Sequence, residues 1–453
     1  MSASAPRWPD RATLWRWHFY AGLFCIPFVL WLAATGSLYV WRPQIEAWLD
    51  RPYAHVTVAG LPRASDAAIA RAAARAVPGS VLHRFELPVT ADQAVQVLVG
   101  QGRAETRVYV QPQTLQVLKA VDEDRRPMKL VFRLHGELLA GAWGSYLVEL
   151  AASWAIVMIL SGLALWWPRG QGPAGTLYPR LALRGRPLWR DLHGVVGLWV
   201  SVFALLFLLS GLPWAKSWGG YLKAARGLGA VVSQDWTTSH GEELRRRAAR
   251  DAGTRAMMDE HAEHAGMMMA HPRIDYGPLD RVARTVAPLG LAAPVLIAPP
   301  AGPGQPWTAK SDAADRPLRV DLTLDPAGRV LTRLDFAERP LLDRLVGTGV
   351  AAHEGQWFGL ANQLLNQAIA LGLALLAVSG AMMWWKRRPH GLLGAPPVAG
   401  ECRLATGFFA LVIALGLYLP LLGGSMLVVL ATERLLLRRL AGPRRWLGLA
   451  PAG

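Results

Sequence analysis

The stretch Trp15-Arg16-Trp17-His18-Phe19-Tyr20-Ala21-Gly22 opens an apolar run that ends at Thr35-Gly36, and this run decides the fold. A second stretch, Trp189-Arg190-Asp191-Leu192-His193-Gly194, continues through Gly197 and ends at Ser210-Gly211. In both, the histidine precedes one glycine by 4 residues and another by 18. Eighteen residues make five helical turns and rise about 27 Å, close to the thickness of a bilayer's hydrocarbon core. Each stretch is therefore predicted to be a membrane helix with a histidine just inside one end.

The composition favours a membrane protein over a nucleic-acid-binding one. The chain has 453 residues, 52% of them hydrophobic, and a formal net charge of +16. The apolar residues lie in long runs and the basic residues cluster at the ends of these runs, where anionic lipid attracts them. We therefore expect contact with the lipid bilayer and no nucleic-acid partner. The two cysteines provide neither a disulfide framework nor a CxxC redox motif, so redox chemistry would need a cofactor.

The distribution of basic residues predicts the topology. Arg7, Arg11 and Arg16 place the N-terminus in the cytoplasm, and the first apolar run is predicted to be an uncleaved signal anchor. The expected segments are a cytoplasmic N-terminus (1–16), helix 17–41, a periplasmic domain (42–131), helix 132–168, a cytoplasmic loop (169–187), helix 188–214, a second periplasmic domain (215–347), helix 348–386, a cytoplasmic loop (387–402), a C-terminal membrane segment (403–440) and a cytoplasmic tail (441–453).

A tandem duplication organises these segments. Ser161-Gly162 follows His135 by 26–27 residues, and Ser379-Gly380 follows His353 by the same distance. Because both halves begin on the same side of the membrane, the repeats are parallel. The predicted fold class is a mainly α membrane protein with four principal helices. A continuous helix from His135 to Trp166-Trp167 would rise about 46 Å, which places His135 and His353 at the outer surface.

Each outer segment is predicted to be a small α+β domain. The first contains a helix at 64–77, capped by Ser65 or Asp66, and strands at 81–87, 95–99, 107–110 and 115–121. The second repeats this order with a helix at 279–286 and a turn at Asp325-Pro326-Ala327-Gly328 between strands 320–324 and 330–334. The C-terminal segment 403–440 is either one kinked helix or a hairpin about Leu419-Pro420, and its basic end favours the hairpin.

Four histidines at duplicated positions form two pairs matched in depth. They could be interfacial anchors, but ionisable groups inside a membrane usually face the bundle interior with a partner. Zinc would require further ligands, and near His18 and His193 only Asp191 offers one, on another helix face. A haem iron accepts two axial histidines and can be buried in a helix bundle. We therefore expect two bis-histidine b-type haems, one held by His18 and His193 and one by His135 and His353.

Smaller residues complete the expected haem sites. Four glycines are predicted to let the macrocycle approach the helix backbone, although close helix–helix packing explains them equally well. Arg190 is a candidate partner for a haem propionate, and positive-inside bias is its alternative explanation. The four glycines are Gly22, Gly36, Gly197 and Gly211.

The motifs WRWHFYAG…ATGSLYVW, RLHGELLAG…LSGLALWWPR, RDLHGVVG…LLSGLPW and AHEGQWFG…VSGAMMWWKRR resemble the four helix motifs of the PepSY-associated transmembrane family. The outer modules at 64–121 and 278–336 resemble its PepSY domains. The resemblance covers about residues 10–390. It implies that the four paired histidines match the family's helix histidines. Because the family includes dihaem inner-membrane reductases, it also implies a location in the bacterial inner membrane and reduction of a ferric siderophore in the periplasm.

One stretch, 257–271, departs from this pattern because it gathers methionines among histidines. Thioether and imidazole ligands suit Cu(I), whereas a solvated loop whose methionines pack on the membrane is the simpler alternative. The candidate copper ligands are His261, His264, His271, Met267, Met268 and Met269.

The expected activity is that of a haem-dependent transmembrane metalloreductase. Electrons would pass from the cytoplasmic side to a periplasmic ferric siderophore or another metal complex. The sequence contains no nucleotide-binding fingerprint, so a separate cytoplasmic protein or a membrane quinol must be the donor. Two alternatives remain: a non-enzymatic PepSY scaffold for periplasmic proteins, and a periplasmic copper-handling protein that uses the Met/His stretch.

Overall fold

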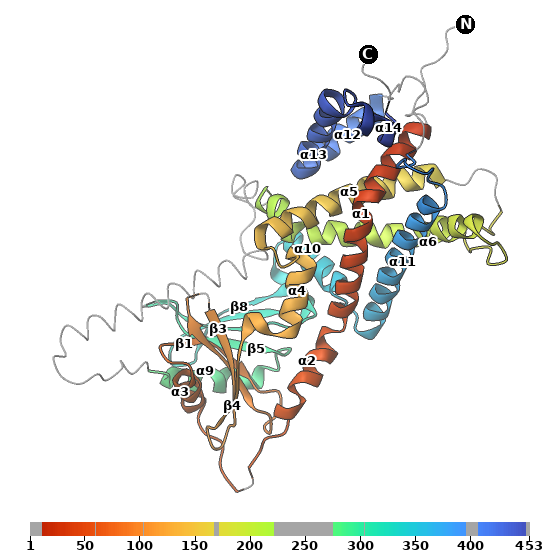
Figure 1. Ribbon diagram of the computed structural model, residues 1–453. Helices are drawn as coiled ribbons and strands as arrows, with labels where there is room; N and C mark the ends of the chain where they lie inside the picture. Colours follow the sequence, from red (N-terminus) through yellow and green to blue (C-terminus); the bar gives the residue numbers. More distant parts are fainter. Residues whose placement is uncertain are drawn as a thin grey trace. The chain divides into compact units, whose positions relative to one another are not determined.

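The computed structural model describes residues 11–58, 60–102, 104–166, 172–221, 275–302, 304–395 and 406–449 (Figure 1). The chain divides into two compact units. We call Met1–Val40, Val131–Gly229 and Leu364–Gly453 the membrane unit, and Trp41–Leu130 and Ala230–Gln363 the sheet unit. Each unit is described by itself.

Long apolar helices build the membrane unit. Five segments of the described chain are long and apolar enough to cross a membrane: Leu14–Val40, Gly141–Trp166, Arg186–Gly211, Leu360–Trp385 and Pro420–Leu437. The helices are α1 (Arg11–Val40), α5 (Gly141–Trp166), α6 (Arg186–Gly211), α11 (Leu360–Trp385), α12 (Thr406–Tyr418), α13 (Pro420–Thr432) with a π-helical end (Glu433–Leu437), and α14 (Ala441–Leu447). Short 3-10 helix η3 (Leu212–Trp214) follows α6.

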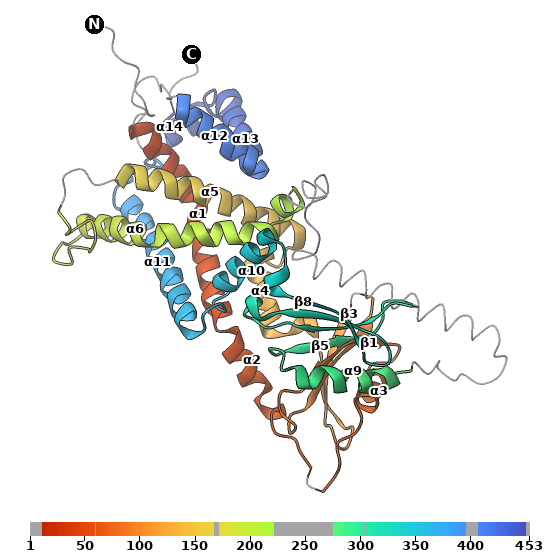
Figure 2. The same cartoon turned by 180° about the vertical axis from the view of Figure 1, so that it is seen from behind.

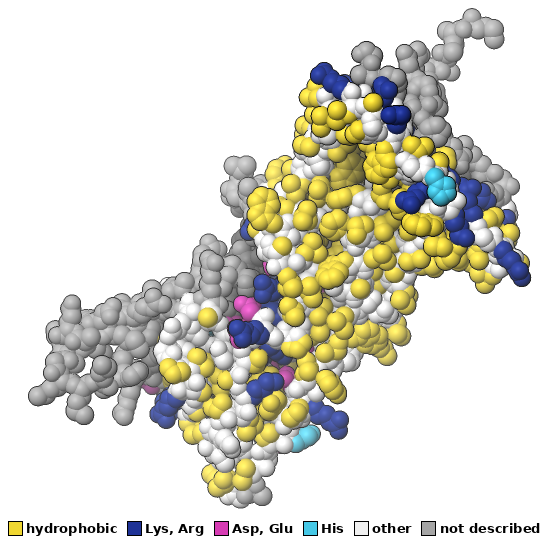
Figure 3. All heavy atoms as spheres, in the orientation of Figure 1, with side chains coloured by type: hydrophobic (Ala, Val, Ile, Leu, Met, Phe, Trp, Pro, Cys, Tyr) yellow, Lys and Arg dark blue, Asp and Glu magenta, His cyan; other side chains and the backbone are white. Residues whose placement is uncertain are grey.

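The outward faces of these helices are apolar. Large hydrophobic side chains such as Trp199, Leu206 and Leu371 are exposed. On the face shown in Figure 3, hydrophobic side chains cover these helices with few charged groups among them. A continuous apolar surface of this kind is stable against lipid and costly in water. The chain is therefore a multi-pass membrane protein.

Two of the predicted long helices are interrupted. Helix α4 (Pro127–Glu137) carries His135 and ends before α5, because Leu138 and Leu139 have left-handed φ values of 49° and 57°. Helix α10 (Leu341–His353) is likewise separated from α11, and Gly355 and Gly359 have φ values of 74° and 67°. The expectation of a continuous helix from each outer histidine was therefore wrong: His135 and His353 lie on separate helices that precede the spans.

The C-terminal segment folds back on itself at Leu419. Gly416 of α12 and Gly423 of α13 meet so closely that a Cβ atom on Gly416 would lie 3.3 Å from the Gly423 Cα. In one straight helix these residues would be about 10.5 Å apart along the axis. The chain therefore turns sharply here, as in the hairpin alternative, and α13 packs on α5 through Trp154, whose Nε1 donates to Ser425 Oγ at 3.1 Å.

The sheet unit contains two modules of the same topology, each a helix followed by four strands. Ser65 caps the first helix by accepting from Ala68 N, as predicted. The first module comprises α3 (Asp66–Ala76), β1 (Val81–Leu87), β2 (Val95–Gln101), β3 (Ala104–Val110) and β4 (Val117–Asp122). The second comprises α9 (Gly277–Val286), β5 (Val295–Ala298), β6 (Trp307–Ser311), β7 (Val320–Leu324) and β8 (Val330–Asp335). Connecting helices are α2 (Arg42–Asp50), η1 (Arg51–Tyr53), η2 (Glu123–Arg125), η4 (Ala287–Leu289), η5 (Arg316–Leu318) and η6 (Phe336–Glu338).

The two predicted α+β modules join edge to edge into one antiparallel sheet. The strand order is β4-β3-β2-β1-β5-β6-β7-β8, so the first strand of each module forms the seam. Across this seam Phe85 pairs with Ile297 and Leu87 with Val295. One hydrophobic core contains α3, α9 and strands from both modules, with Ile69, Phe85 and Leu279 fully buried. The modules therefore fold as one domain.

Candidate functional site

His18 is held on α1 by the neighbouring helix α5. Its Nδ1 lies 2.9 Å from the Met158 carbonyl oxygen and 3.2 Å from Ser161 Oγ. Gly162 makes room for the ring, because a Cβ atom there would lie 2.8 Å from His18 Cε1. Figure 1 shows α1 crossing α5. The Ser161-Gly162 pair thus forms the binding position for the His18 ring.

His193 on α6 repeats this arrangement against α11. Its Nδ1 lies 3.1 Å from the Leu376 carbonyl oxygen and 3.0 Å from Ser379 Oγ. A Cβ atom on Gly380 would lie 3.5 Å from His193 Cε1. Seen from behind, α6 crosses α11 (Figure 2). The duplication is therefore reproduced at the level of single hydrogen bonds.

The hydrogen-bond partners define which ring nitrogen carries the proton. A backbone carbonyl can only accept, so Nδ1 of both His18 and His193 must be the N–H donor. Ser161 and Ser379 donate their own hydroxyl protons to the same carbonyls, at 3.1 and 3.0 Å. The neutral imidazole then has its lone pair on Nε2, the form in which histidine binds metals.

The two rings lie opposite each other within the membrane unit. Their centroids are 6.3 Å apart and their planes make an angle of 83°. Two imidazoles that share one metal ion have ring centres about 6 Å apart, because each metal–nitrogen bond is about 2 Å long. The separation of His18 and His193 therefore fits a pair of ligands to a single metal.

The one carboxylate near this pair in the sequence is engaged elsewhere. Asp191 is buried and accepts from Arg180, whose Nε and Nη2 lie 2.8 and 2.7 Å from its two oxygens. No group of three His, Cys, Asp or Glu side chains gathers as metal ligands in the described ranges. The donor set at His18 and His193 is two imidazoles, which suits the two axial positions of a haem iron better than a tetrahedral zinc site.

His135 is anchored in the same manner at the other end of α1. Its Nδ1 lies 2.9 Å from Thr35 Oγ1, which donates its own proton to the Trp31 carbonyl at 2.8 Å. Thr35 Oγ1 therefore accepts from Nδ1, so Nε2 again has the lone pair. A Cβ atom on Gly36 would lie 3.3 Å from His135 Cε1, so Gly36 makes room for this ring, and its role toward a macrocycle stays a prediction.

The partner predicted for His135 belongs to the other unit. His353 is the last residue of α10, in the sheet unit, whereas His135 is in the membrane unit. The pairing of these two histidines stays a prediction. Gly211 ends α6 directly after Ser210, at the position equivalent to Gly36.

The glycines one turn after His18 and His193 face side chains of the next helix. A Cβ atom on Gly22 would lie 3.8 Å from Met158 Sδ, and one on Gly197 would lie 3.5 Å from Leu376 Cδ2. These are ordinary contact distances, so both glycines contribute to helix–helix packing. A role toward a macrocycle stays a prediction for them.

Two groups of predicted positions stay untested. Arg190 is exposed, and its role toward a propionate is still a prediction. The candidate copper ligands His261, His264, His271, Met267, Met268 and Met269 lie outside the described residues.

The side chains that hold the histidines are not among the residues predicted from the sequence. Ser161, Ser379 and Thr35 each bond to a histidine on another helix. A signal for them existed: each is the small hydroxyl residue of a Ser-Gly or Thr-Gly pair whose spacing repeats between the halves. The spacing of these pairs predicts the duplication but does not show that their hydroxyl groups contact histidines.

The fold and the site define a multi-pass membrane protein in which a tandem helix duplication brings paired histidines together. The family model for the PepSY-associated TM region matches residues 15–387, which is most of the chain. The chain belongs to this family. No curated protein matches it.

Proposed function

We propose that the protein carries electrons across the membrane through two bis-histidine haems and reduces a metal complex, most readily a ferric siderophore. His18 and His193 would ligate one haem, and His135 and His353 the other. A bound haem supplies a one-electron carrier whose potential depends on its axial ligands and their hydrogen bonds. The observation that carries the proposal is the pair His18 and His193, with ring centres 6.3 Å apart and both Nδ1 atoms anchored.

The chain's own residues would fix the ligands. The carbonyls of Met158 and Leu376 hold the tautomer that leaves Nε2 available, and the serine hydroxyls fix the ring orientation. Such partners usually raise the basicity of a histidine ligand. Because they are already in place, binding requires little rearrangement of these side chains.

Reduction gives a chemical reason for metal release. Hydroxamate and catecholate oxygens are hard ligands and favour Fe(III) over Fe(II), so adding one electron weakens the complex. The reaction transfers an electron and breaks no covalent bond in the ligand. It therefore needs no nucleophile or general base from the chain.

The test is the haem content of the purified full-length protein. We expect a reduced b-type spectrum with two haems per chain, and loss of one haem in the double variant His18→Ala, His193→Ala. His390→Ala, which changes an exposed histidine outside the pairs, is the control. A double variant that keeps both haems would overturn the assignment of His18 and His193, and a protein without haem would favour the scaffold alternative.

Substrate class is tested separately, by mixing the reduced protein with ferric complexes in a stopped-flow spectrometer. We expect a ferric hydroxamate or catecholate complex to reoxidise the haems. If these complexes leave the haems reduced while another metal complex oxidises them, electron transfer stands and the siderophore assignment fails.

A further inference from the structure

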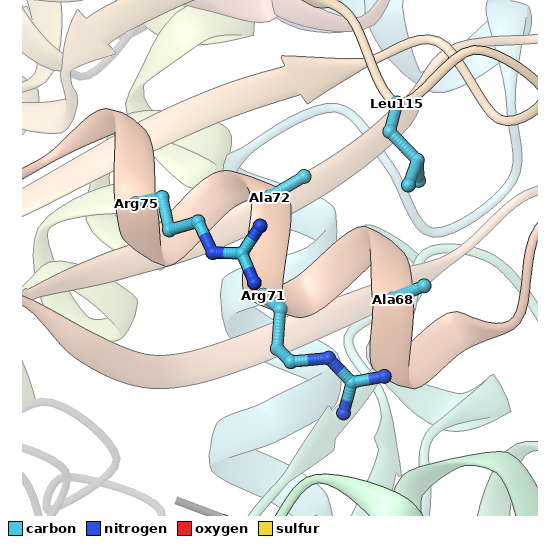
Figure 4. A pocket seen from close by; sticks show the side chains of 5 residues that line it. All are labelled: Ala68, Arg71, Ala72, Arg75 and Leu115. Atoms are coloured by element: carbon cyan, nitrogen blue, oxygen red, sulfur yellow. The ribbon is translucent and has the colours of Figure 1, made fainter. Parts of the chain in front are cut away.

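An open pocket of about 330 Å³ lies on the surface of the first module of the sheet unit. One side is a face of α3 and the other is the turn between β3 and β4 (Figure 4). Its lining residues are Ala68, Arg71, Ala72, Arg75 and Leu115. The pocket thus combines two guanidinium groups with an apolar wall.

The two arginines are neighbours on the helix surface, because residues four apart lie on one face. Among the described residues neither Arg71 nor Arg75 has a hydrogen-bonded or ion-paired partner, whereas Arg107 in the same module bonds to Glu123 at 2.8 Å. Arg71 is half-buried and Arg75 is exposed, and an anion bound in the pocket would be attracted to both cations.

The second module provides an internal comparison. The helices α3 and α9 align on the Val77-Pro78 and Ala287-Pro288 pairs that follow them, which makes Arg71 equivalent to Arg281 and Arg75 equivalent to Thr285. The turns align because Gln111 N bonds to Gln116 O, as Asp325 N bonds to Arg329 O. Leu115 is then equivalent to Gly328.

In the second module the turn packs directly against the helix. Arg281 Nε donates to the Pro326 carbonyl at 2.9 Å. A Cβ atom on Gly328 would lie 2.9 Å from the Arg281 carbonyl oxygen and 3.1 Å from Thr285 Oγ1. The helix and the turn therefore leave no room for a side chain at Gly328.

In the first module each of these contacts is replaced. The Pro112 carbonyl accepts from the backbone N–H of Ala64 at 2.8 Å, so Arg71 is not needed there. Leu115 occupies the glycine position with φ of 62°, a backbone conformation that is unfavourable for a bulky residue. Strain of this kind persists where the surroundings favour it, often at a ligand site. Here it places an apolar side chain opposite Ala68 and Ala72.

We propose that this pocket binds a small organic carboxylate. The carboxylate would bond to Arg71 and Arg75, which match its planar geometry, and its apolar part would contact Ala68, Ala72 and Leu115. The volume is within the range of small-molecule sites. The proposal is independent of the haem assignment.

The test is calorimetric titration of the full-length protein in lipid nanodiscs with benzoate. We expect saturable binding at one site per chain and at least tenfold weaker binding to the variant Arg71→Gln, Arg75→Gln. The variant Arg281→Gln, Arg284→Gln removes the same charge from the second module and should bind as the wild type does. Benzamide, which lacks the charge, and inorganic phosphate, which lacks the apolar part, should each bind at least tenfold more weakly than benzoate.

The variant Leu115→Gly separates binding from folding. It copies the second module and relieves the left-handed leucine, which offsets the loss of the leucine's packing on the core. The fold should therefore be retained, as checked by hydrogen–deuterium exchange of β3 and β4, while benzoate affinity falls. Absence of saturable benzoate binding would overturn the proposal. So would equal binding of benzamide or phosphate, or unchanged benzoate affinity in the Arg71→Gln, Arg75→Gln variant.

Discussion

In the membrane unit the hydrogen bonds of His18 recur at His193, whereas in the sheet unit the two modules share a topology and differ in what equivalent positions touch. His18 and His193 each bond to a carbonyl and a serine on the following span. Leu115 and Gly328, by contrast, hold equivalent positions, but Leu115 lines an open pocket and Gly328 lies against the helix with no room for a side chain. As the proposed ligands of one metal, His18 and His193 would have to satisfy the same geometry, whereas equivalent surface positions of the two modules can differ.

The ion pairs of the sheet unit also differ between the two modules. Changing them is expected to have the largest effect, on the stability of the sheet. Arg107 on β3 bonds to Glu123 at 2.8 Å and to Glu86 at 2.9 Å, and all three side chains are largely buried. The equivalent position on β7 is Asp321, which pairs with Arg339 with the charges reversed and is more exposed. Burial raises the pKa of Glu123, but Arg107 and Arg126 outweigh it, so the pKa lies below its usual value.

We predict that Arg107→Met destabilises the sheet by about 3–5 kcal/mol, because it removes the cation paired with buried Glu86 and leaves Glu123 with Arg126 alone, 3.5 Å away. The change Asp321→Asn should cost less than about 1 kcal/mol. The measurement is hydrogen–deuterium exchange of β3 and β4 peptides in the full-length protein.

The pH dependence of this destabilisation follows from the sign of the shift. A carboxyl with a lowered pKa stabilises the fold above its unfolded pKa, and this contribution is lost as the pH falls. The difference between wild type and Arg107→Met should therefore shrink from pH 7 toward about pH 4. A difference that grows on acidification would contradict the assignment.

The next effect tests the symmetry of the membrane unit. A Cβ atom on Gly162 would lie 2.8 Å from His18 Cε1, whereas one on Gly380 would lie 3.5 Å from His193 Cε1. We predict that Gly162→Ala displaces the His18 ring and speeds haem loss about tenfold, which corresponds to about 1.4 kcal/mol and is typical of overpacking. Gly380→Ala should change the rate less than about twofold, since a 3.5 Å contact is an ordinary one.

The measurement is the rate of haem transfer to an excess of apo-globin. Equal rates for Gly162→Ala and Gly380→Ala would mean that the space around the His18 and His193 rings is more alike than these distances indicate.

The smallest effect concerns the serine hydroxyls. Ser161→Ala and Ser379→Ala each remove one acceptor from a histidine Nδ1 while the carbonyl remains. The ligand becomes less basic and Fe(III) less stabilised, so the midpoint potential should rise by about 20–60 mV in each case. Spectroelectrochemistry measures this shift.

Ser201→Ala is the matched control. Ser201 lies in α6 and is buried like Ser379, but its hydroxyl donates to the Gly197 carbonyl and, within the described part of the chain, bonds to no histidine. If the midpoint potential shifts as far in Ser201→Ala as in Ser379→Ala, the hydroxyl bonded to the histidine has no specific effect on the potential.

Local sequence patterns predicted much of the fold. The alternation in 81–87 and 320–324 predicted β1 and β7 to the residue, and Ser65 was foreseen as a cap. The break after α4 was missed, because Leu138 and Leu139 adopt a left-handed backbone for which their residue type gives no signal. The seam between β1 and β5 was missed because such pairing depends on tertiary packing, which no local period encodes.

For the candidate site, the sequence predicted the pairing of His18 and His193 and not the groups that hold them. The spacing identified His18 and His193, and the structure places them 6.3 Å apart. It could not show that Ser161 and Ser379 reach across to another helix, because a helical period gives the face of a residue and not its neighbour.

The seam between β1 and β5 also bears on how the protein is made. Roughly 200 residues separate Leu87 from Val295, so the ribosome needs about 10–40 s to deliver the second strand after the first. During that interval the edge of β1 is open, and open edges attract other chains. We therefore expect the β1 edge of the nascent first module to need protection from other chains until β5 of the second module is synthesised.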